Sequence, residues 1–384
     1  MRGNKKKVYL DYNSTTPIDK RVLEEMLPFF TEKFGNASSI SHAYGWDAEE
    51  GVELARDRVA KLINAKSNEI YFTSGGTESI NLALLGICKA NESKGNHLIT
   101  CQTEHKAVLD TCEQLIQNGT DITYLPVSKS GNIDLQQLQE SITKQTIAVC
   151  LMHANNEIGT IHPLAKISKI TRDSNVLLVT DASQSAGKIP LDVDAYGVDI
   201  AILSAHKMYG PKGVGALYVR SGVQLTPMHY GGGQERKLRP GTLNTPGIVG
   251  FGKAAELCHL EMQKDADRLQ KLIELIEYEF AEEPGIHING ENGQRLPHVT
   301  NLTFENIDGS RLIRTLKNLA VSQSSACSSN TLKPSHVLTA IGHDPLLALS
   351  SLRIGIGRFT TKNEVRLAIG DIMNAVDHLK LTAT

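Results

Sequence analysis

IAILSAHK, residues 200–207, is the stretch from which the fold of this 384-residue chain can be predicted. Its first four residues are apolar, as in a buried strand, and a polar, glycine-rich turn follows directly. A second such run, VLLVTDASQ at residues 176–184, ends in Asp181 and Gln184. Ligands of open α/β sheets bind at the carboxyl ends of the strands, so we expect Lys207 and Asp181 at one shared edge.

An amine and a carboxylate at such an edge meet the requirements of pyridoxal phosphate. A lysine forms a Schiff base with this cofactor, and an aspartate keeps its pyridine nitrogen protonated so that the ring can accept electrons. Alone, Lys207 would be interpreted as a solvated loop lysine and Asp181 as a helix cap. Together with their surroundings, the two residues favour a cofactor site.

Strand-like and helix-like segments alternate between about residues 50 and 220, which predicts a mainly parallel sheet covered by helices. The strand-like segments 69–73, 97–100 and 147–152 each lead into polar residues, which we expect on one rim of the sheet. After the first of them, the residues SGGT at 74–77 precede a helix-like segment. Glycines at a helix N-terminus are suited to binding a phosphate.

The remainder of the chain predicts a second domain. Apolar residues repeat at helical spacing from Met262 to Phe280, as in a long amphipathic helix. We expect it to connect a large domain, residues 15–260, to a small domain formed by residues 1–14 and 261–384. A last helix is predicted to bury one face, formed by Val365, Ile369, Ile372, Val376 and Leu379.

The composition argues against several classes of protein. Forty basic and 42 acidic side chains give a net charge of −2, which does not suggest a nucleic-acid-binding surface. The basic N-terminus lacks the apolar core of a signal peptide, and no run reaches the ~18 apolar residues of a membrane span. We therefore predict a soluble, cytoplasmic protein that binds neither nucleic acid nor a membrane.

The six cysteines include no C-x-x-C pair, so neither a zinc site nor a disulfide framework is predicted. Five of them lie in helix-like or strand-like stretches and are interpreted as buried structural thiols. These are Cys88, Cys101, Cys112, Cys150 and Cys258. Cys327 differs, because it lies in a small, polar, serine-rich segment that predicts a surface loop. It is the candidate for a reactive thiol.

Motifs along nearly the whole chain, from YLDY at 9–12 to GRFT at 357–360, resemble those of the cysteine desulfurases of the NifS/IscS type. Between these ends lie TSGGTES (73–79), TEH (103–105), NNEIG (155–159), DASQ (181–184), SAHK (204–207), RPGT (239–242), SACS (325–328) and SSLR (350–353). The resemblance implies the α/β fold type I of pyridoxal-phosphate-dependent, class V aminotransferase-like enzymes. It includes a large domain with a mainly parallel, seven-stranded type of sheet and a smaller α+β domain that carries the persulfide loop, at about residues 322–334.

The resemblance also implies roles for single residues. Lys207 would form the Schiff base, Asp181 would pair with the pyridine nitrogen, and Gln184 would bind the ring hydroxyl. His105 would stack on the ring and serve as an acid or base, and Arg353 would bind the substrate carboxylate through two hydrogen bonds. Asn156 would contact both cofactor and substrate. The phosphate would be bound by Gly76, Thr77, Ser204, His206 and, from the neighbouring subunit of a homodimer, Thr242.

The implied activity is the removal of sulfur from L-cysteine. Cys327 would attack the substrate sulfur as a thiolate and become a persulfide, while the carbon skeleton would leave as L-alanine. A loop at this position could then carry the sulfur to an acceptor protein, such as an iron–sulfur scaffold, or toward tRNA thiolation. No metal cofactor is expected; Cys327 is at most a transient ligand of an iron–sulfur cluster.

Several alternatives stay open at this stage. The same scaffold could host an aminotransferase or a selenocysteine lyase, or it could be a non-catalytic binding protein. Asn156 could be a turn residue, and His105 could be only a helix cap. Arg353 could form a structural ion pair, with Arg358 close enough to compete for the substrate carboxylate.

Overall fold

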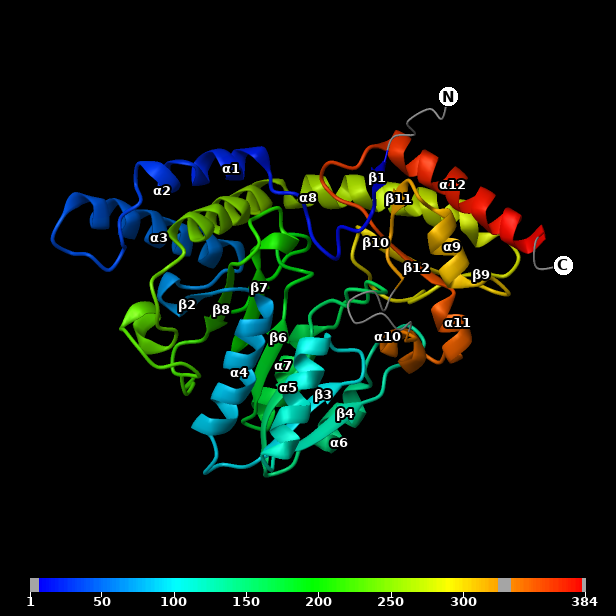
Figure 1. Ribbon diagram of the computed structural model, residues 1–384. Coiled ribbons are helices and arrows are strands. Elements are labelled where there is room, and N and C mark those ends of the chain that lie inside the picture. The colour runs from blue at the N-terminus through cyan, green and yellow to red at the C-terminus, as the bar shows by residue number, and fades with distance from the viewer. Residues whose placement is uncertain (1–6, 324–332, 382–384) are drawn as a thin grey trace.

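The computed structural model describes residues 7–323 and 333–381. Its largest sheet has seven strands in the order β2-β8-β7-β6-β5-β3-β4 (Figure 1). The strands are β2 (Ile70–Thr73), β3 (His97–Cys101), β4 (Asp121–Leu125), β5 (Thr146–Cys150), β6 (Leu177–Asp181), β7 (Ile200–Ser204) and β8 (Gly215–Val219). β8 runs in the direction opposite to the other six strands, which all point the same way. The prediction of a mainly parallel, seven-stranded sheet is therefore confirmed.

Helices cover both faces of this sheet, because neighbouring residues of a strand point to opposite faces. In β3, Leu98 packs against apolar residues of α4 (Gly76–Ala90) and α5 (Lys106–Gln117). Ile99 packs on the other face, in a cluster with residues of α3 (Ala43–Leu62) and α7 (Leu164–Asp173). The strands are hydrophobic on both faces, as expected for a buried parallel sheet. The shorter helices α1 (Lys20–Met26), α2 (Pro28–Thr31) and α6 (Leu135–Ser141) complete this part.

A second apolar cluster surrounds a three-stranded antiparallel sheet with the order β12-β10-β9. Its strands are β9 (Ile286–Ile288), β10 (Val299–Phe304) and β12 (Ser351–Gly355), and β1 (Val8–Tyr9) pairs in parallel with β11 (Leu319–Ala320) nearby. The helices here are α9 (Gly309–Thr315), α10 (His336–Ala340), α11 (Pro345–Leu349) and α12 (Lys362–Leu381). All five apolar residues predicted for the buried face of α12 are buried, which confirms that helix. The division of the chain into domains at residue 260 stays a prediction.

The helix α8 (Thr245–Ala281) runs alongside both sheets (Figure 1). The sequence predicted a long amphipathic helix from Met262 to Phe280, and the observed helix begins well before this range. Asn244 caps the actual N-terminus by accepting a hydrogen bond from the Gly247 amide. The first part of α8 is glycine-rich because it packs closely on α3: a Cβ atom on Gly252 would lie 2.4 Å from the Ala55 Cα. Glycine lowers helix propensity, which hid this part of the helix from the sequence pattern.

The carboxyl ends of β2, β3, β5, β6 and β7 lie on one rim of the large sheet. β2 and β7 are both antiparallel to β8 and so point the same way, and the other three strands are parallel to β7 through their neighbours. This confirms the prediction of one rim that gathers the polar strand ends. Within the described ranges, no helix has the length and apolar character needed to cross a membrane.

Candidate active site

A pocket of about 250 Å³ opens at this rim. Of the predicted site residues that the structure describes, Thr242 is the one that does not line it. The pocket brings together Gly76, Thr77, His105, Asn156, Asp181, Gln184, Ser204, His206, Lys207 and Arg353. Thr242 is exposed, and Cys327 lies outside the described residues.

Lys207 and Asp181 reach the pocket from adjacent strands. Asp181 ends β6, is buried, and accepts a hydrogen bond from the Ser183 amide at 2.9 Å. Lys207 lies in a short 3₁₀ turn after β7, and its Nζ donates to the carbonyl oxygens of Asn13 at 2.6 Å and of Ser14 at 2.8 Å. The ammonium group is thus held at the pocket by backbone atoms distant in sequence.

His105 is both a pocket residue and a helix cap. Its Nδ1 accepts a hydrogen bond from the Ala107 amide at 3.1 Å, at the N-terminus of α5. Because Nδ1 is the acceptor, the proton of the neutral ring is on Nε2. Desolvation lowers the His105 pKa, and the charge of Lys207 adds to this effect while Asp181 opposes it. His105 is therefore neutral at pH 7, with Nε2–H as its free donor.

The turn that starts α4 fits a phosphate group. Gly75 has φ = 151°, a conformation that favours glycine, and no side chain caps the helix at this residue. The first amide groups of α4 therefore lack a side-chain acceptor. They lie at the positive end of the helix dipole, where an anion binds favourably. A Cβ atom on Gly76 would lie 3.2 Å from the Ser183 Oγ, so a larger residue would narrow the pocket here.

Asn13 and Ser14 are pocket residues that the sequence analysis missed, and Thr15 beside them contacts the pocket residue His206. Asn13 exchanges hydrogen bonds with Gln184: its Nδ2 donates to Oε1 at 3.3 Å and its carbonyl oxygen accepts from Nε2 at 2.9 Å. The Thr15 hydroxyl lies 3.1 Å from the His206 Nδ1. Burial lowers the pKa of His206 to about 4, with contributions from nearby lysines, so this ring is neutral. The polar run NSTT directly after the YLDY motif was the signal that could have indicated this segment.

Arg353, on β12, is buried beside the pocket and pairs with the same N-terminal segment. Its Nη2 donates to the Asp11 carboxylate at 2.9 Å and to the Ser14 hydroxyl at 2.7 Å. Nη1 lies 3.3 Å from the carbonyl oxygen of Asn156, and Nε has no hydrogen-bond partner among the described residues. The ion-pair interpretation of Arg353 is therefore correct, but a buried, unpaired N–H also leaves it able to bind a carboxylate.

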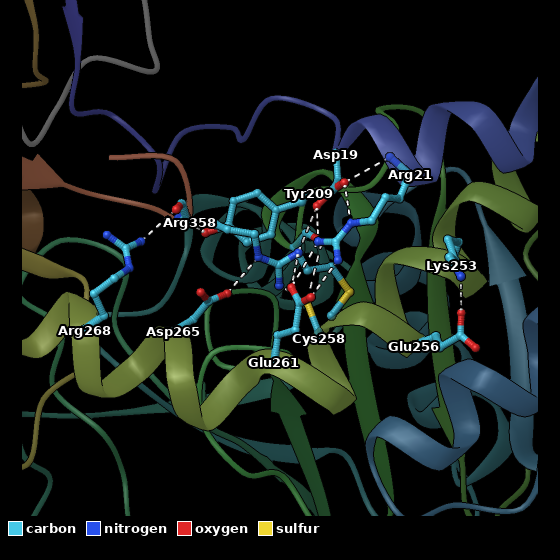
Figure 2. Close-up of polar contacts among 11 residues, drawn as sticks. Asp19, Arg21, Tyr209, Lys253, Glu256, Cys258, Glu261, Asp265, Arg268 and Arg358 are labelled. Atoms are coloured by element: carbon cyan, nitrogen blue, oxygen red, sulfur yellow. Dashed lines mark hydrogen bonds and ion pairs between the residues drawn. The ribbon is translucent and has the colours of Figure 1, made fainter. Parts of the chain in front are cut away.

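Arg358 lies in a different place and does not line the pocket. Figure 2 shows it among carboxylates from α8 and the N-terminal segment. It donates to Asp265 at 2.7 Å and to Asp19 at 3.1 Å, and its amide donates to the Tyr209 hydroxyl at 2.7 Å. Hydrogen bonds from Arg21, with a further one from Arg358, hold the Asp19 pKa at about 2. These bonds occupy the Arg358 guanidinium, so it does not compete with Arg353 for a ligand.

The five described cysteines are poor nucleophiles. Cys101, Cys112, Cys150 and Cys258 are buried as predicted, whereas Cys88, near the end of α4, is only partly buried, which corrects one prediction. Burial raises the thiol pKa of all five, to about 11 for Cys88 and to about 12 for Cys112. Each of them is therefore protonated at neutral pH.

Comparison with known proteins identifies the family. The model of the family described as Aminotransferase class-V matches residues 8–367. This chain belongs to the class-V aminotransferase family. Members of the family use pyridoxal phosphate, in agreement with the turn, the lysine and the aspartate that meet in the pocket.

Relatives within the class-V aminotransferases are similar over nearly the whole chain. A protein of Rickettsia typhi (strain ATCC VR-144 / Wilmington), named cysteine desulfurase IscS, is 50% identical over 97% of this chain and 92% of its own length. A protein of the same name from Anaeromyxobacter sp. (strain Fw109-5) is 51% identical over 97% of this chain and 93% of its own length. A solved NifS-like protein superposes with a TM-score of 0.91 at 39% identity, covering 97% of this chain and 100% of its own. The solved structure of SspA in complex with cysteine superposes with a TM-score of 0.82 at 37% sequence identity. It covers 92% of this chain and 100% of its own.

Glu104 is a second residue near the class-V aminotransferase pocket whose environment the sequence did not reveal. It is fully buried, its Oε1 accepts from the Met152 amide at 2.7 Å, and its Oε2 has no partner among the described residues. Burial, with a contribution from Asp181, raises the Glu104 pKa to about 8. The folded protein therefore keeps this carboxyl protonated at pH 7.

Substitution of Glu104 by glutamine is expected to make protein stability less sensitive to alkaline pH. The unfolded carboxyl ionises near its ordinary value, ~4.3, whereas the folded one stays protonated to about pH 8, so wild-type stability falls as the pH rises between these values. Glutamine does not titrate and keeps the acceptor for Met152. Thermal unfolding should show that the free energy of unfolding of E104Q, relative to that of the wild type, rises by on the order of a few kcal/mol between pH 5 and pH 8. A constant difference across this range would contradict the assigned pKa.

Proposed function

We propose that this protein is a pyridoxal-phosphate-dependent cysteine desulfurase, which releases L-alanine from L-cysteine and carries the sulfur as a persulfide on Cys327. The observation that carries the proposal is the convergence of Lys207, Asp181 and Arg353 on one pocket, from the turn after β7, the end of β6 and β12. Relatives named cysteine desulfurase IscS at about 50% identity, and a solved relative in complex with cysteine, support this choice of reaction and substrate.

The pocket residues fit the cofactor. The unpaired amides at the start of α4, with Thr77, Ser204 and His206, would bind its phosphate, and Asp181 and Gln184 would bind its ring. The neutral state of His206 suits a hydrogen-bond donor better than a charge partner. When bound, the cofactor supplies an electron sink for the electron pair left by removal of the substrate α-proton.

The chain's own groups move the protons. The carbonyl oxygens of Asn13 and Ser14 form a place for the free Lys207 amine, and we assign the acceptance of the α-proton to this amine. His105 cannot accept a proton at Nδ1 without losing its hydrogen bond to Ala107. We therefore assign the Nε2–H of His105 a donor role toward the substrate, which is the acid of the two roles, acid or base, that the resemblance implied.

Cys327 is proposed as the sulfur acceptor because of its chemistry. A thiolate is the attacking species, and the raised pKa values of the five described thiols argue against each of them. Cys327 itself lies outside the described residues. The attack forms a sulfur–sulfur bond, breaks the carbon–sulfur bond of the substrate, and leaves its electron pair on the carbon skeleton, which is protonated to L-alanine.

A homodimer is proposed as the working form. Thr242 is exposed and does not line the pocket of its own chain, as expected for a residue that completes the pocket of a neighbouring copy. Large apolar side chains are also exposed at the start of α3 and just before it, which favours association. They include Ile40 at 81%, Tyr44 at 54% and Trp46 at 55%. An acceptor protein, in iron–sulfur cluster assembly or tRNA thiolation, and a cytoplasmic location complete the proposal.

Peptide mass analysis of Cys327 after addition of L-cysteine without reductant, with alanine measured in the same sample, tests the proposal. One added sulfur on Cys327 together with alanine is the expected result. Alanine without this modification would move the sulfur carrier elsewhere. If cofactor is bound but neither product forms, the desulfurase proposal fails and an aminotransferase becomes the better hypothesis. Selenocysteine assayed alongside L-cysteine would distinguish a desulfurase from a selenocysteine lyase, because a lyase would form alanine from selenocysteine alone.

Substitution of Arg353 by lysine is expected to raise KM for L-cysteine by about tenfold or more, with a smaller effect on kcat. Lysine keeps the charge but cannot hold Asp11 and a substrate carboxylate at once in the geometry of a guanidinium. Steady-state kinetics with R358K as the matched control measures this. R358K should lower the unfolding temperature, because Arg358 bonds Asp19 and Asp265, but leave KM unchanged. Equal KM changes in both variants would remove Arg353 from the substrate site.

A further inference from the structure

β2 forms one edge of the large sheet, and charged side chains cover its open side. The Phe72 amide donates to the Glu235 carboxylate at 2.7 Å. The Ile70 carbonyl oxygen accepts from the Arg56 guanidinium at 2.8 Å and also from Arg236. Edge strands usually leave such groups to water or to another strand. Here the loop after β8, together with Arg56 of α3, supplies bonds that an eighth strand would otherwise make.

A buried ion pair holds this loop in place. Arg56 and Glu235 form two hydrogen bonds of 2.8 Å, and their side chains are only 4% and 1% exposed. Glu235, Arg236 and Lys237 have φ values of 41°, 53° and 67°, a left-handed conformation that costs energy for residues other than glycine. The loop adopts this conformation because it brings the Glu235 carboxylate and the Arg236 guanidinium onto β2 at the same time.

A second ion pair joins the same loop to the phosphate-binding turn. The Nε of Arg239 donates to Glu78 Oε1 at 2.9 Å, and Glu78 Oε2 accepts from the Ser74 amide at 2.7 Å. Burial alone would raise the Glu78 pKa, but these hydrogen bonds outweigh it and lower the pKa, so the carboxylate stays charged. Glu78 and Ser74 flank Gly75, Gly76 and Thr77 in the sequence. The loop is therefore bound to β2 before the turn, through Glu235 and Arg236, and to α4 after it, through Arg239.

We propose that the loop of residues 234–242 is a clamp that holds the phosphate-binding turn in its binding conformation, with Arg239 as a positioning residue for cofactor retention. This inference rests on the proposed function, because it requires the cofactor phosphate to bind at residues 75–77. The clamp ends at Thr242, the residue proposed to reach the neighbouring subunit, and the Gln234 side chain closes it by accepting from the Gly241 amide at 3.0 Å. One loop therefore supports the cofactor site of its own chain and contributes to that of the other.

Substitution of Arg239 by glutamine in the holoenzyme tests the clamp. Without Arg239, the Glu78 charge next to the turn is unpaired and repels the phosphate, and the turn loses one of its attachments. The rate of cofactor release into an excess of another pyridoxal-phosphate-binding apoenzyme should rise about fivefold. The unfolding temperature of the variant without cofactor should stay close to that of the wild type, because the Arg239 side chain is 26% exposed.

Arg295→Gln is the matched control. Arg295 pairs with Glu277 at 2.8 Å, with side chains 18% and 16% exposed, away from the pocket. This variant should release cofactor at the wild-type rate. Release from R239Q at the wild-type rate, or equal acceleration in R239Q and R295Q, would overturn the clamp. A wild-type holoenzyme that holds cofactor but forms no alanine from cysteine would overturn the desulfurase proposal alone, since the release experiment needs no turnover.

Discussion

Substitution of Lys207 by alanine is expected to lower turnover of L-cysteine by at least about 10³-fold. The variant loses both functions proposed for this residue: the covalent bond to the cofactor and the amine that accepts the α-proton. Its Nζ donates to the backbone carbonyl oxygens of Asn13 and Ser14, so the substitution removes these two hydrogen bonds together with the amine. The measurement is alanine formation, together with gel filtration of the protein and spectroscopy of the cofactor that stays bound.

Lys212 provides the control for this experiment. It lies in the next turn of the chain, is exposed and does not line the pocket. K212A should retain wild-type turnover and bind cofactor covalently. K207A should still bind cofactor noncovalently, through the residues proposed for its phosphate and ring, and lose it on gel filtration. A K207A protein that retains turnover within tenfold of the wild type would contradict the assignment of the lysine.

The sequence predicted the large sheet and its rim well, because both depend on local patterns. The runs before Asp181 and Lys207 are apolar on both faces, and each is followed by a break in the pattern. Once the strands are parallel, their carboxyl ends must gather on one rim. The pocket residues on this rim therefore followed from the order of the strands, without any knowledge of their distances.

The partners of these residues were not predictable, since they depend on contacts between distant parts of the chain. Asp11 and Arg353 are separated by 342 positions, and Arg56 and Glu235 by 179. No periodicity links such residues, and a charged residue alone is usually read as solvated. The left-handed conformation at Glu235 is also invisible in the sequence, because tertiary contacts impose it on residues that do not favour it.

Substitution of Cys327 by serine is expected to abolish the sulfur adduct and to lower alanine formation by at least about 10²-fold under turnover. A serine hydroxyl is not ionised at neutral pH and does not take up sulfur from a thiol substrate, so the carbon–sulfur bond loses its acceptor. Cofactor binding should be unchanged, because no residue assigned to the cofactor lies in this segment. The measurement compares alanine formation and peptide mass in the variant and the wild type.

Cys88→Ser is the control that separates a general effect of thiol loss from a specific one. Cys88 is the one partly accessible thiol among the described cysteines, and burial raises its pKa to about 11. C88S should therefore form alanine and the Cys327 adduct as the wild type does. If C327S turned over normally and C88S did not, the sulfur would travel through α4, and the interpretation of the serine-rich segment would be wrong. If both variants formed alanine at the wild-type rate, another thiol would have to accept the sulfur, and Cys327 would not be the persulfide carrier.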